Sequence, residues 1–410
     1  MRILQINKFF FLKGGAERYF FDLSEVLAEK GHRVVLWSVR NDNNFSYPEE
    51  NNFARSVDFS KNEGIFKEIL KGKNIFWNKD AAKKLEKVIK IHRPDVAHLH
   101  NIFTHFSPSI ISVLKKYNIP VVMTLHDYKI FCPNYTFFTG GKICFDCLKK
   151  KNYYSCLKKK CVKNSRLKSL AGFFEGEWLK FLKVDQKIDI FLAPSAYLRR
   201  KAIAWGIPRE KIYTLPNFIF KEKEIIGRKS DKNYLLYFGR LSREKGVDLL
   251  IESFAELLKD FPYWNLKIVG DGPEKERLKN LAGGRKEIEF LEFQNGREMK
   301  RILAGADIVV VPSRWPENFP YAVLESFALA RPVIAAKIGG LPEVVKEGKT
   351  GVLFLSGDKE DLKEKIAYAI NNLSRIKEFG VFAQKEVLRK YNSEKHYQKL
   401  IKIYAGIKRS

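Results

Sequence analysis

No apolar run in the sequence reaches the roughly 18 residues that a membrane-spanning helix needs. The first twelve residues, M-R-I-L-Q-I-N-K-F-F-F-L, are interrupted by Gln5, Asn7 and Lys8 and contain no small-residue cleavage site. They therefore predict a first strand rather than a signal peptide. Without a spanning segment or a leader, we expect a cytoplasmic protein.

The glycine pattern of nicotinamide enzymes is also missing. The first strand is followed by K-G-G-A-E at residues 13–17, and not by G-x-G-x-x-G. An NAD-type Rossmann oxidoreductase would nevertheless share the alternation of strands and helices described below. It is one alternative function, and nicotinamide binding would reveal it.

Acidic residues are scarce relative to basic ones. The chain has 47 Asp and Glu residues and 75 Lys and Arg residues, which gives a formal net charge of +28. This balance favours negatively charged partners, namely nucleic acid, an anionic membrane or a phosphorylated substrate. Lysine enrichment in a heat-adapted protein would give the same charge without a partner. A basic nucleic-acid-binding protein is thus a second alternative, with steeply salt-dependent binding as its signature.

The composition is that of a folded protein: 45% of the residues are hydrophobic and 30% are charged. A chain of 410 residues is too long for one comfortable core. Two domains are therefore expected.

All five cysteines lie in one insertion at about residues 132–170: Cys132, Cys144, Cys147, Cys156 and Cys161. The C-x-x-C pair and the looser C-x4-C pair are typical of a structural zinc ion held by four of the five thiolates. Disulfide bonds and free thiols are the alternatives. Four thiolates would leave no open coordination position, so we expect no catalytic metal.

The same insertion is rich in basic residues: Lys149, Lys150, Lys151, Lys158, Lys159, Lys160, Lys163, Arg166 and Lys168. Tyr153, Tyr154, Leu157 and Leu170 are interspersed with them. Basic and apolar side chains mixed in this way are typical of proteins that bind the surface of an anionic bilayer. A solvated basic face and a nucleic-acid contact are the alternatives.

Along the first half of the chain, strands alternate with helices, which predicts a parallel sheet of the α/β class. Strands are expected at residues 3–6, 34–39, 94–101, 120–125 and 188–193, and helices at 19–30, 81–90 and 107–117. Open parallel sheets bind ligands at the carboxyl ends of their strands. Gly14 and Gly15 follow the first strand and His126 follows the fourth. His98, His100 and His105 are expected to be structural.

The second half repeats the alternation, with strands expected at residues 234–238, 265–269, 288–293 and 308–311. The first of them leads into G-R-L-S-R-E-K-G at residues 239–246. On this glycine-bounded loop, Arg240 can bind two phosphate oxygens and Lys245 adds a point charge, which predicts a diphosphate clamp. A solvated charged loop is the alternative.

The strand at residues 308–311 is followed by a polar loop carrying Glu317 and Asn318, and then by a helix that must end at Arg331-Pro332. A helix start carries about half a positive charge and free N–H groups, which suit phosphate or sugar oxygens. Glu317 lies just before this helix and Glu325 lies within it. A pair of solvent-facing glutamates is the alternative.

Glu317 and Glu325 resemble the E-x7-E motif of the retaining glycosyltransferases of family 4. The flanking S-R-W-P, N-F-P and R-P-V-I-A make the match more specific. G-G-A-E-R, T-L-H-D, G-R-L-S-R-E-K-G-V, V-G-D-G-P-E and G-G-L-P-E resemble further loops of the family. The resemblance covers nearly the whole chain, apart from the cysteine insertion and residues 41–90. It implies the GT-B fold, in which two Rossmann-like parallel-sheet domains face a cleft.

The resemblance also implies a nucleotide-diphosphate sugar donor, an acceptor hydroxyl and retention of the anomeric configuration. The implied catalytic residues are His126, Glu317, Arg240 and Lys245. The implied donor-binding residues are Gly14, Gly15, Arg240, Lys245, Gly270, Asn318, Phe319, Glu325, Gly339 and Gly340. Family members lack a metal-binding D-x-D clamp and none stands out here, so no catalytic cofactor is expected. Glu292 replaces a glycine common in the loop that contacts the base, which leaves the nucleobase open.

From these matches we expect an acceptor-side domain at residues 1–218, a nucleotide-sugar domain at 219–392 and a last helix at 393–410 that returns to the first domain. Residues 221–232 are expected to link the two domains. The acceptor is expected to be a sugar, a glycolipid or a lipid-linked oligosaccharide used for surface polysaccharide or glycolipid synthesis. The enzyme would then work on the inner membrane face.

Overall fold

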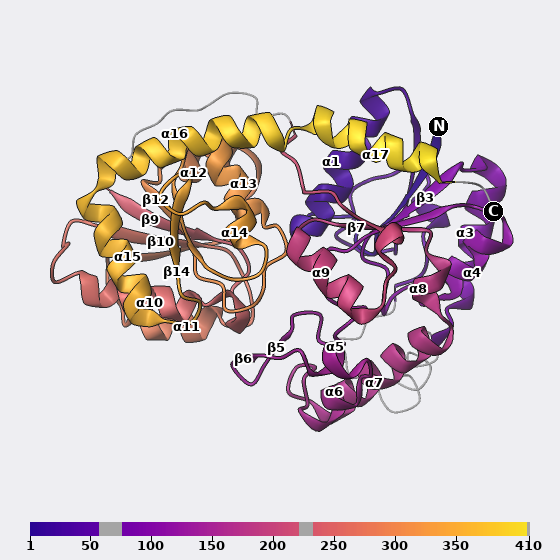
Figure 1. The fold of residues 1–410 in the computed structure, drawn as a ribbon, viewed down its shortest axis with the longest axis horizontal. Coiled ribbons are helices and arrows are strands. Elements are labelled where there is room, and N and C mark those ends of the chain that lie inside the picture. Colours follow the sequence, from indigo (N-terminus) through magenta and orange to yellow (C-terminus); the bar gives the residue numbers. More distant parts are fainter. Residues whose placement is uncertain (57–75, 221–232, 408–410) are drawn as a thin grey trace. The chain divides into compact units, whose positions relative to one another are not determined.

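The computed structural model describes residues 1–56, 76–220 and 233–407. The chain divides into two compact units (Figure 1). The first comprises residues 1–140, 144–216 and 396–410, and the second comprises 217–395 with 141–143. The linker expected at residues 221–232 lies outside the described residues.

The first unit is built on a six-stranded parallel sheet in the order β2-β1-β3-β4-β7-β8. Its strands are β1 (Arg2–Ile6), β2 (Arg33–Trp37), β3 (Val96–Leu99), β4 (Val121–Thr124), β7 (Ile190–Ala193) and β8 (Ile212–Thr214). The helices around it are α1 (Gly15–Glu29), α3 (Lys79–His92), α4 (Ser109–Lys116), α8 (Val184–Lys187), α9 (Ala196–Trp205) and, from His396 on, α17 (Ser393–Gly406). Strands β3 and β4 are buried throughout, as expected for a parallel sheet covered by helices.

The second unit has a six-stranded parallel sheet in the order β11-β10-β9-β12-β13-β14. Its strands are β9 (Tyr234–Phe238), β10 (Asn265–Val269), β11 (Ile288–Leu291), β12 (Ile308–Val311), β13 (Val333–Ala336) and β14 (Gly351–Phe354). The helices are α10 (Val247–Leu257), α11 (Lys275–Ala282), α12 (Gly296–Gly305), α13 (Tyr321–Ala328), α14 (Leu341–Val344), α15 (Lys359–Asn371) and α16 (Leu373–Lys390). Numbered within the unit, the order is 3-2-1-4-5-6, that of a Rossmann domain.

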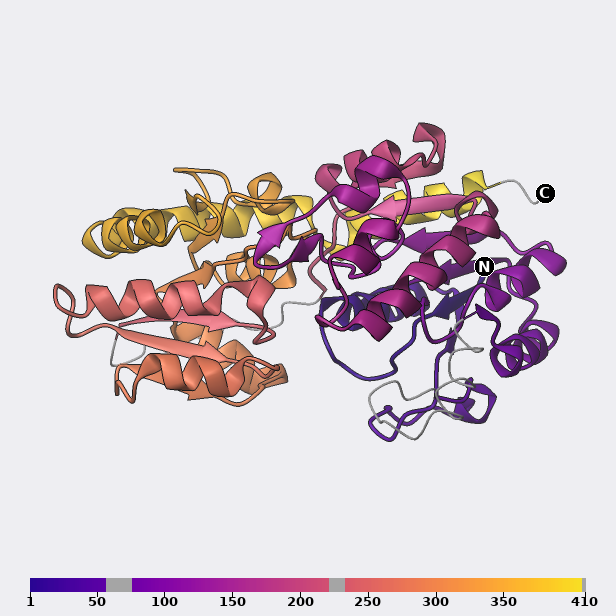
Figure 2. The ribbon, with the colours of Figure 1, turned by 90° about the horizontal axis from the view of Figure 1, so that it is seen from below.

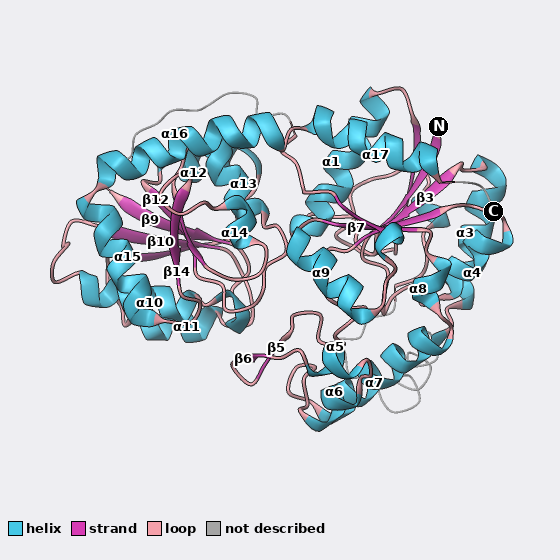
Figure 3. Ribbon diagram, viewed as in Figure 1, coloured by secondary structure: helices cyan, strands magenta, loops and turns pink. Residues whose placement is uncertain are grey.

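In both units helices pack on the sheet (Figures 2 and 3). The buried side chains of the second unit form one continuous apolar core, to which the central strands β9 and β12 contribute most of their residues. Each parallel sheet is therefore enclosed in apolar surface, and ligand-binding groups are left to the loops at the strand ends.

The cysteine insertion contains only short elements: β5 (Phe138–Thr139), β6 (Lys142–Ile143), α5 (Asp146–Lys150) and α6 (Tyr154–Lys158). It packs against the longer helix α7 (Arg166–Phe181), where Gly176 leaves room for the ring of Tyr153. A Cβ at Gly176 would lie 2.6 Å from that ring. Tyr153 is buried, so it is not one of the exposed aromatic residues expected among the lysines.

Several sequence-based boundaries need correction, among them those of β2, β3 and β11, which are shorter than expected. Helix α1 begins at Gly15, so part of the expected glycine loop belongs to the helix. Strand β7 begins at Ile190 rather than at residue 188. No helix within the described ranges is both long and apolar enough to cross a membrane.

Candidate active site

The second sheet reverses its strand order between β9 and β12, which form adjacent parallel strands. The connections leave these two strands in opposite directions, and open parallel sheets bind ligands at the carboxyl ends of strands at such a switch point. The loop after β9 carries Lys245, and the loop after β12 carries Glu317. The topology thus brings together two residues that are 72 positions apart in the sequence.

Glu317 is buried, and three donors converge on one of its carboxylate oxygens, Oε1. The ammonium of Lys245 lies 2.6 Å from it, the hydroxyl of Ser313 2.7 Å and the indole N–H of Trp315 2.8 Å. The Lys245 ammonium also lies 5.0 Å from the centre of the Trp315 ring. Within the part of the chain that the structure describes, the second oxygen, Oε2, accepts no hydrogen bond. Glu317 is therefore held rigidly by one oxygen, and the other is available for a ligand.

The loops of this site pack backbone to backbone, which requires glycine. A Cβ at Gly246 would lie 2.1 Å from the carbonyl oxygen of Pro312, and one at Gly339 would lie 2.4 Å from that of Glu317. Gly340 donates its N–H to the same Glu317 carbonyl at 2.6 Å. Gly270 approaches the carbonyl of Gly239 in the same way. The predicted glycines Gly270, Gly339 and Gly340 thus set the loop positions.

Arg240 is exposed, and among the described residues its guanidinium makes no ion pair. Its backbone is fixed by a hydrogen bond of 2.8 Å from the Tyr237 hydroxyl to the Arg240 carbonyl. This cation is therefore attached to a rigid loop and free to meet an anion.

The other predicted donor residues surround the start of α13. Glu325 is half-buried within α13, and Asn318 is buried just before the helix. Phe319 is buried against Tyr391 with the ring centres 5.2 Å apart, and its carbonyl accepts a hydrogen bond from Asn217. The side chain of Phe319 therefore packs in the core instead of lining the site. Glu292 forms an ion pair with Lys275 at 2.6 Å, so its side chain is already engaged.

The first unit carries the remaining predicted residues at the carboxyl ends of its own strands. Gly14 precedes α1 and Gly15 begins it, and both are exposed. Glu17, in the first turn, is buried, and its carboxylate lies 3.5 Å from the Asn7 amide. Burial raises the pKa of Glu17, and the nearby Lys8 opposes that rise.

His126 follows β4 and belongs to a buried histidine network. It shares a hydrogen bond of 3.0 Å with His100, which also bonds Gln5 at 2.6 Å. His98 bonds the hydroxyls of Tyr404 and Thr124, each at 2.7 Å. His98 and His100 are therefore held inside the fold, as expected for structural histidines.

Helix α17 completes this network from the far end of the chain. His396 bonds the Tyr19 hydroxyl at 2.9 Å and the Pro216 carbonyl at 2.9 Å. Burial lowers the pKa of His126 and of His396 to about 3, and it lowers the pKa of His98 and His100 well below the usual value. These four histidines are thus neutral at physiological pH.

Sequence reasoning missed several of these partners. Ser313 and Trp315 lie in the S-R-W-P run next to Glu317, and their nearness in sequence is a signal that could have found them. Tyr19, Gln5, His396 and Tyr404 surround the other histidines from distant segments, and no spacing in the sequence indicates this.

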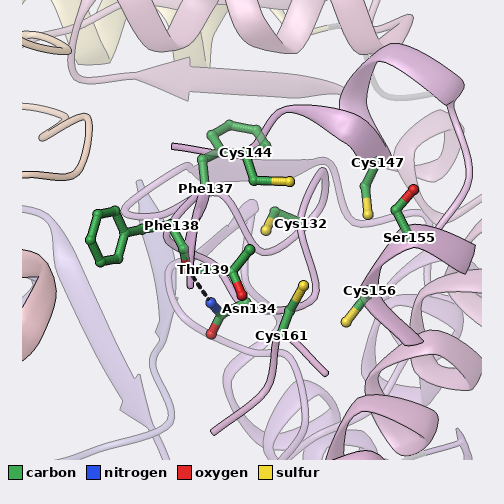
Figure 4. A pocket seen from close by; sticks show the side chains of 10 residues that line it. All are labelled: Cys132, Asn134, Phe137, Phe138, Thr139, Cys144, Cys147, Ser155, Cys156 and Cys161. Atoms are coloured by element: carbon green, nitrogen blue, oxygen red, sulfur yellow. Dashed lines mark hydrogen bonds between the residues drawn. The ribbon is translucent and has the colours of Figure 1, made fainter. Parts of the chain in front are cut away.

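The five cysteines line a single cavity of about 10 Å³ (Figure 4). None of them forms a disulfide bond. Burial raises the pKa of Cys132 to about 11 and of Cys147 to about 12, whereas a hydrogen bond with Cys156 lowers the pKa of Cys161 to about 7. As the side chains stand, no three His, Cys, Asp or Glu residues in the described ranges are placed to hold a metal ion.

Two family models match the chain. The one described as Glycosyltransferase Family 4 matches residues 13–223, and the one described as Glycosyl transferases group 1 matches residues 218–386.

Among curated relatives, an uncharacterized glycosyltransferase of Methanocaldococcus jannaschii is 35% identical over 184 residues, which cover 44% of this chain and 50% of the relative. A sulfoquinovosyl transferase of Arabidopsis thaliana is 26% identical over 316 residues, which cover 72% of this chain and 53% of the relative. The chain thus spans about half the length of these two relatives.

The solved structure of Anabaena HepE, in complex with UDP and glucose, superimposes with a TM-score of 0.68 at 18% identity. The match covers 99% of this chain and 100% of HepE. This likeness confirms the predicted fold, GT-B, with two Rossmann-like parallel-sheet domains.

Proposed function

Because the chain belongs to glycosyltransferase family 4, we propose that it transfers a sugar from a nucleotide-diphosphate sugar to an acceptor hydroxyl with retention of anomeric configuration. The observation that carries this proposal is the arrangement of Lys245 and Glu317 at the switch point of the second sheet. A cation and a carboxylate with one free oxygen, side by side, suit a diphosphate joined to a sugar. HepE, which shares the fold, was solved with UDP and glucose, which is consistent with such a donor.

In this reaction the bond between the anomeric carbon and the diphosphate oxygen breaks, and its electron pair leaves with the diphosphate. The acceptor oxygen forms the new bond to the anomeric carbon, and the proton of the acceptor hydroxyl goes to the leaving diphosphate. Lys245 and Arg240 stabilise the negative charge that grows there. Lys245 has three N–H donors and uses one of them on Glu317, so two remain for phosphate oxygens. Backbone N–H groups at the start of α13 face the same anion.

Glu317 orients the sugar through its free Oε2, and its negative charge offsets positive charge at the anomeric carbon. Glu325 binds the ribose hydroxyls, and Gly339 and Gly340 allow the donor to approach the backbone. In the first unit, the family resemblance assigns donor binding to Gly14 and Gly15 and a catalytic role to His126. His126 is neutral, so it contacts the sugar by a hydrogen bond and not as a charge.

Thermal shifts with UDP, GDP, ADP and NAD test the donor site. A ligand at about a hundred times its dissociation constant stabilises a protein by roughly 2.7 kcal/mol. We expect one nucleoside diphosphate to raise the melting temperature of the wild type and to have little effect on Lys245→Ala. The matched control is Lys349→Ala, because Lys349 is an exposed lysine of the same unit. A shift with NAD alone would instead favour an oxidoreductase.

We further propose that the acceptor is presented at an anionic membrane surface. Helix α7 exposes Leu167, Leu170, Phe174 and Phe181, which recur at helical spacing on one face. Exposed lysines of the insertion, among them Lys149, Lys150, Lys158 and Lys168, supply the complementary charge.

Flotation with vesicles containing an anionic lipid tests this second proposal. We expect the wild type to float with anionic but not with neutral vesicles, and Leu167→Ser/Phe181→Ser to stay in the soluble fraction. The control is Tyr263→Ser, which removes an exposed aromatic side chain of the second unit. Equal flotation of all three proteins would contradict the proposed surface, and tight binding to DNA or RNA instead would favour the nucleic-acid alternative.

A further inference from the structure

The cysteine insertion has little to hold it together by itself. Helices α5 and α6 have five residues each, and the β5–β6 hairpin has two residues in each strand. Helices of one turn and isolated two-stranded hairpins are not stable in water. Segments of this kind are usually held by a cross-link, which is a disulfide bond or a structural metal ion.

The structure places all five thiols around one cavity, although they come from four different parts of the insertion. Cys132 follows a turn, Cys144 follows β6, Cys147 lies in α5, and Cys156 and Cys161 lie in and after α6. Figure 4 shows these side chains surrounding the same space. At about 10 Å³, the cavity has room for a single small occupant.

The sulfur of Cys144 has a cationic donor directed at it. The Lys159 ammonium lies 3.4 Å from this sulfur. Metal-bound thiolates are stabilised by such outer donors, which also orient them.

We propose that this insertion binds one structural zinc ion through four of the five cysteines that line the cavity, with Cys144 and Cys147 of the C-x-x-C pair among them. Four thiols lose four protons as four zinc–sulfur bonds form, so the site carries a net charge of −2. Lys159 and the surrounding lysines offset that charge. Because the thiols as they stand do not form a metal site, binding requires these side chains to rearrange around the cavity.

This site is closed by four thiolates and has no open position, so its role is to fix the insertion. The insertion begins just after His126, at the carboxyl end of β4. Zinc would thus stabilise the conformation of the insertion, which follows His126, a residue predicted to contact the sugar. The inference does not depend on the proposed transfer reaction.

Metal analysis of the full chain, purified under reducing conditions without chelator, tests the site. We expect about one zinc per chain in the wild type, and a thiolate-to-metal charge-transfer band after replacement by Co²⁺. Cys144→Ser and Cys147→Ser, which each remove one thiol of the C-x-x-C pair, should lose the metal. A wild type that binds no Zn²⁺ on titration, or a Cys156–Cys161 disulfide in a non-reducing peptide map, would overturn the proposal.

The choice of ligands is tested separately. Cys132→Ser, Cys156→Ser and Cys161→Ser identify the other two ligands, because one of these three variants should keep the zinc. Retention of zinc in all five single-cysteine variants would contradict the proposed site. Where a variant folds poorly, the wild-type zinc content and cobalt spectrum still decide whether the site exists.

Discussion

The two sheets of this protein have similar strand orders, but their carboxyl edges differ in chemistry. In the second unit the edge carries charged side chains. Lys245 and Glu317 form an ion pair of 2.6 Å, and the exposed Arg240 lies on the same loop as Lys245. In the first unit the edge carries His98, His100 and His126, which burial keeps neutral. Parallel sheets of related topology therefore each offer a place for a ligand and leave its chemistry to the side chains.

The proposed function gives this difference a meaning. Under that proposal a leaving diphosphate requires fixed positive charge, and Lys245 and Arg240 of the second unit are the cations proposed to supply it. A sugar is uncharged and is bound by hydrogen bonds, which neutral imidazoles both donate and accept. The comparison can be tested by changing each edge separately.

The largest effect is expected from removing the charge of the second edge. Lys245→Ala should lower activity at least tenfold, which is roughly 1.4 kcal/mol or more in transition-state stabilisation. Turnover with the donor found by thermal shift measures it, and Lys349→Ala is the control. Wild-type turnover in Lys245→Ala would contradict the proposed role of Lys245 in binding the diphosphate.

The next effect concerns the backbone beneath that charge. Gly246 and Gly348 have nearly the same conformation, with φ of 69° and 68°, but only Gly246 lacks room for a Cβ. Gly246→Ala should therefore cost about 2 kcal/mol more in unfolding free energy than Gly348→Ala. Chemical denaturation of both variants measures the difference. Equal losses would mean that the contact with Pro312 relaxes easily.

The smallest effect is expected from the buried histidines of the first unit, which make the unfolding free energy depend on pH. The buried histidines have lowered pKa values in the folded protein. Between about pH 3 and pH 6.5 the unfolded chain therefore binds more protons than the folded chain, and the unfolding free energy falls as the pH falls. From pH 7 to pH 5.5, each deeply buried histidine should reduce the unfolding free energy by about 1 kcal/mol. Burial raises the pKa of Glu17 and Asp127, which acts in the opposite sense at lower pH.

Urea unfolding at several pH values measures this slope. His98→Gln should make it shallower, because one titrating group is removed from the network. A slope unchanged by this substitution would indicate that His98 does not remain neutral in the folded protein.

Much of the architecture was predictable from local sequence. Strands β9, β10 and β12 have the predicted bounds, because short apolar runs flanked by glycine or proline are strong strand signals. The start of α1 was placed too late, because Gly14 and Gly15 suggested a loop although the helix begins at Gly15. Tyr153 was expected on the surface among lysines, and only the space left by Gly176 explains its burial.

The sequence by itself determined the parallel α/β class, the two-domain organisation expected from length, and the loops that carry Arg240, Lys245, Glu317 and Glu325. These are properties of neighbouring residues, since periodicity and turn chemistry act over a few positions. Only the tertiary structure decided that Lys245 meets Glu317, that α17 brings His396 and Tyr404 to the histidines, and that five cysteines face one cavity. The first two of these contacts join segments far apart in the chain, and all three are set by how the elements pack, which no local pattern specifies.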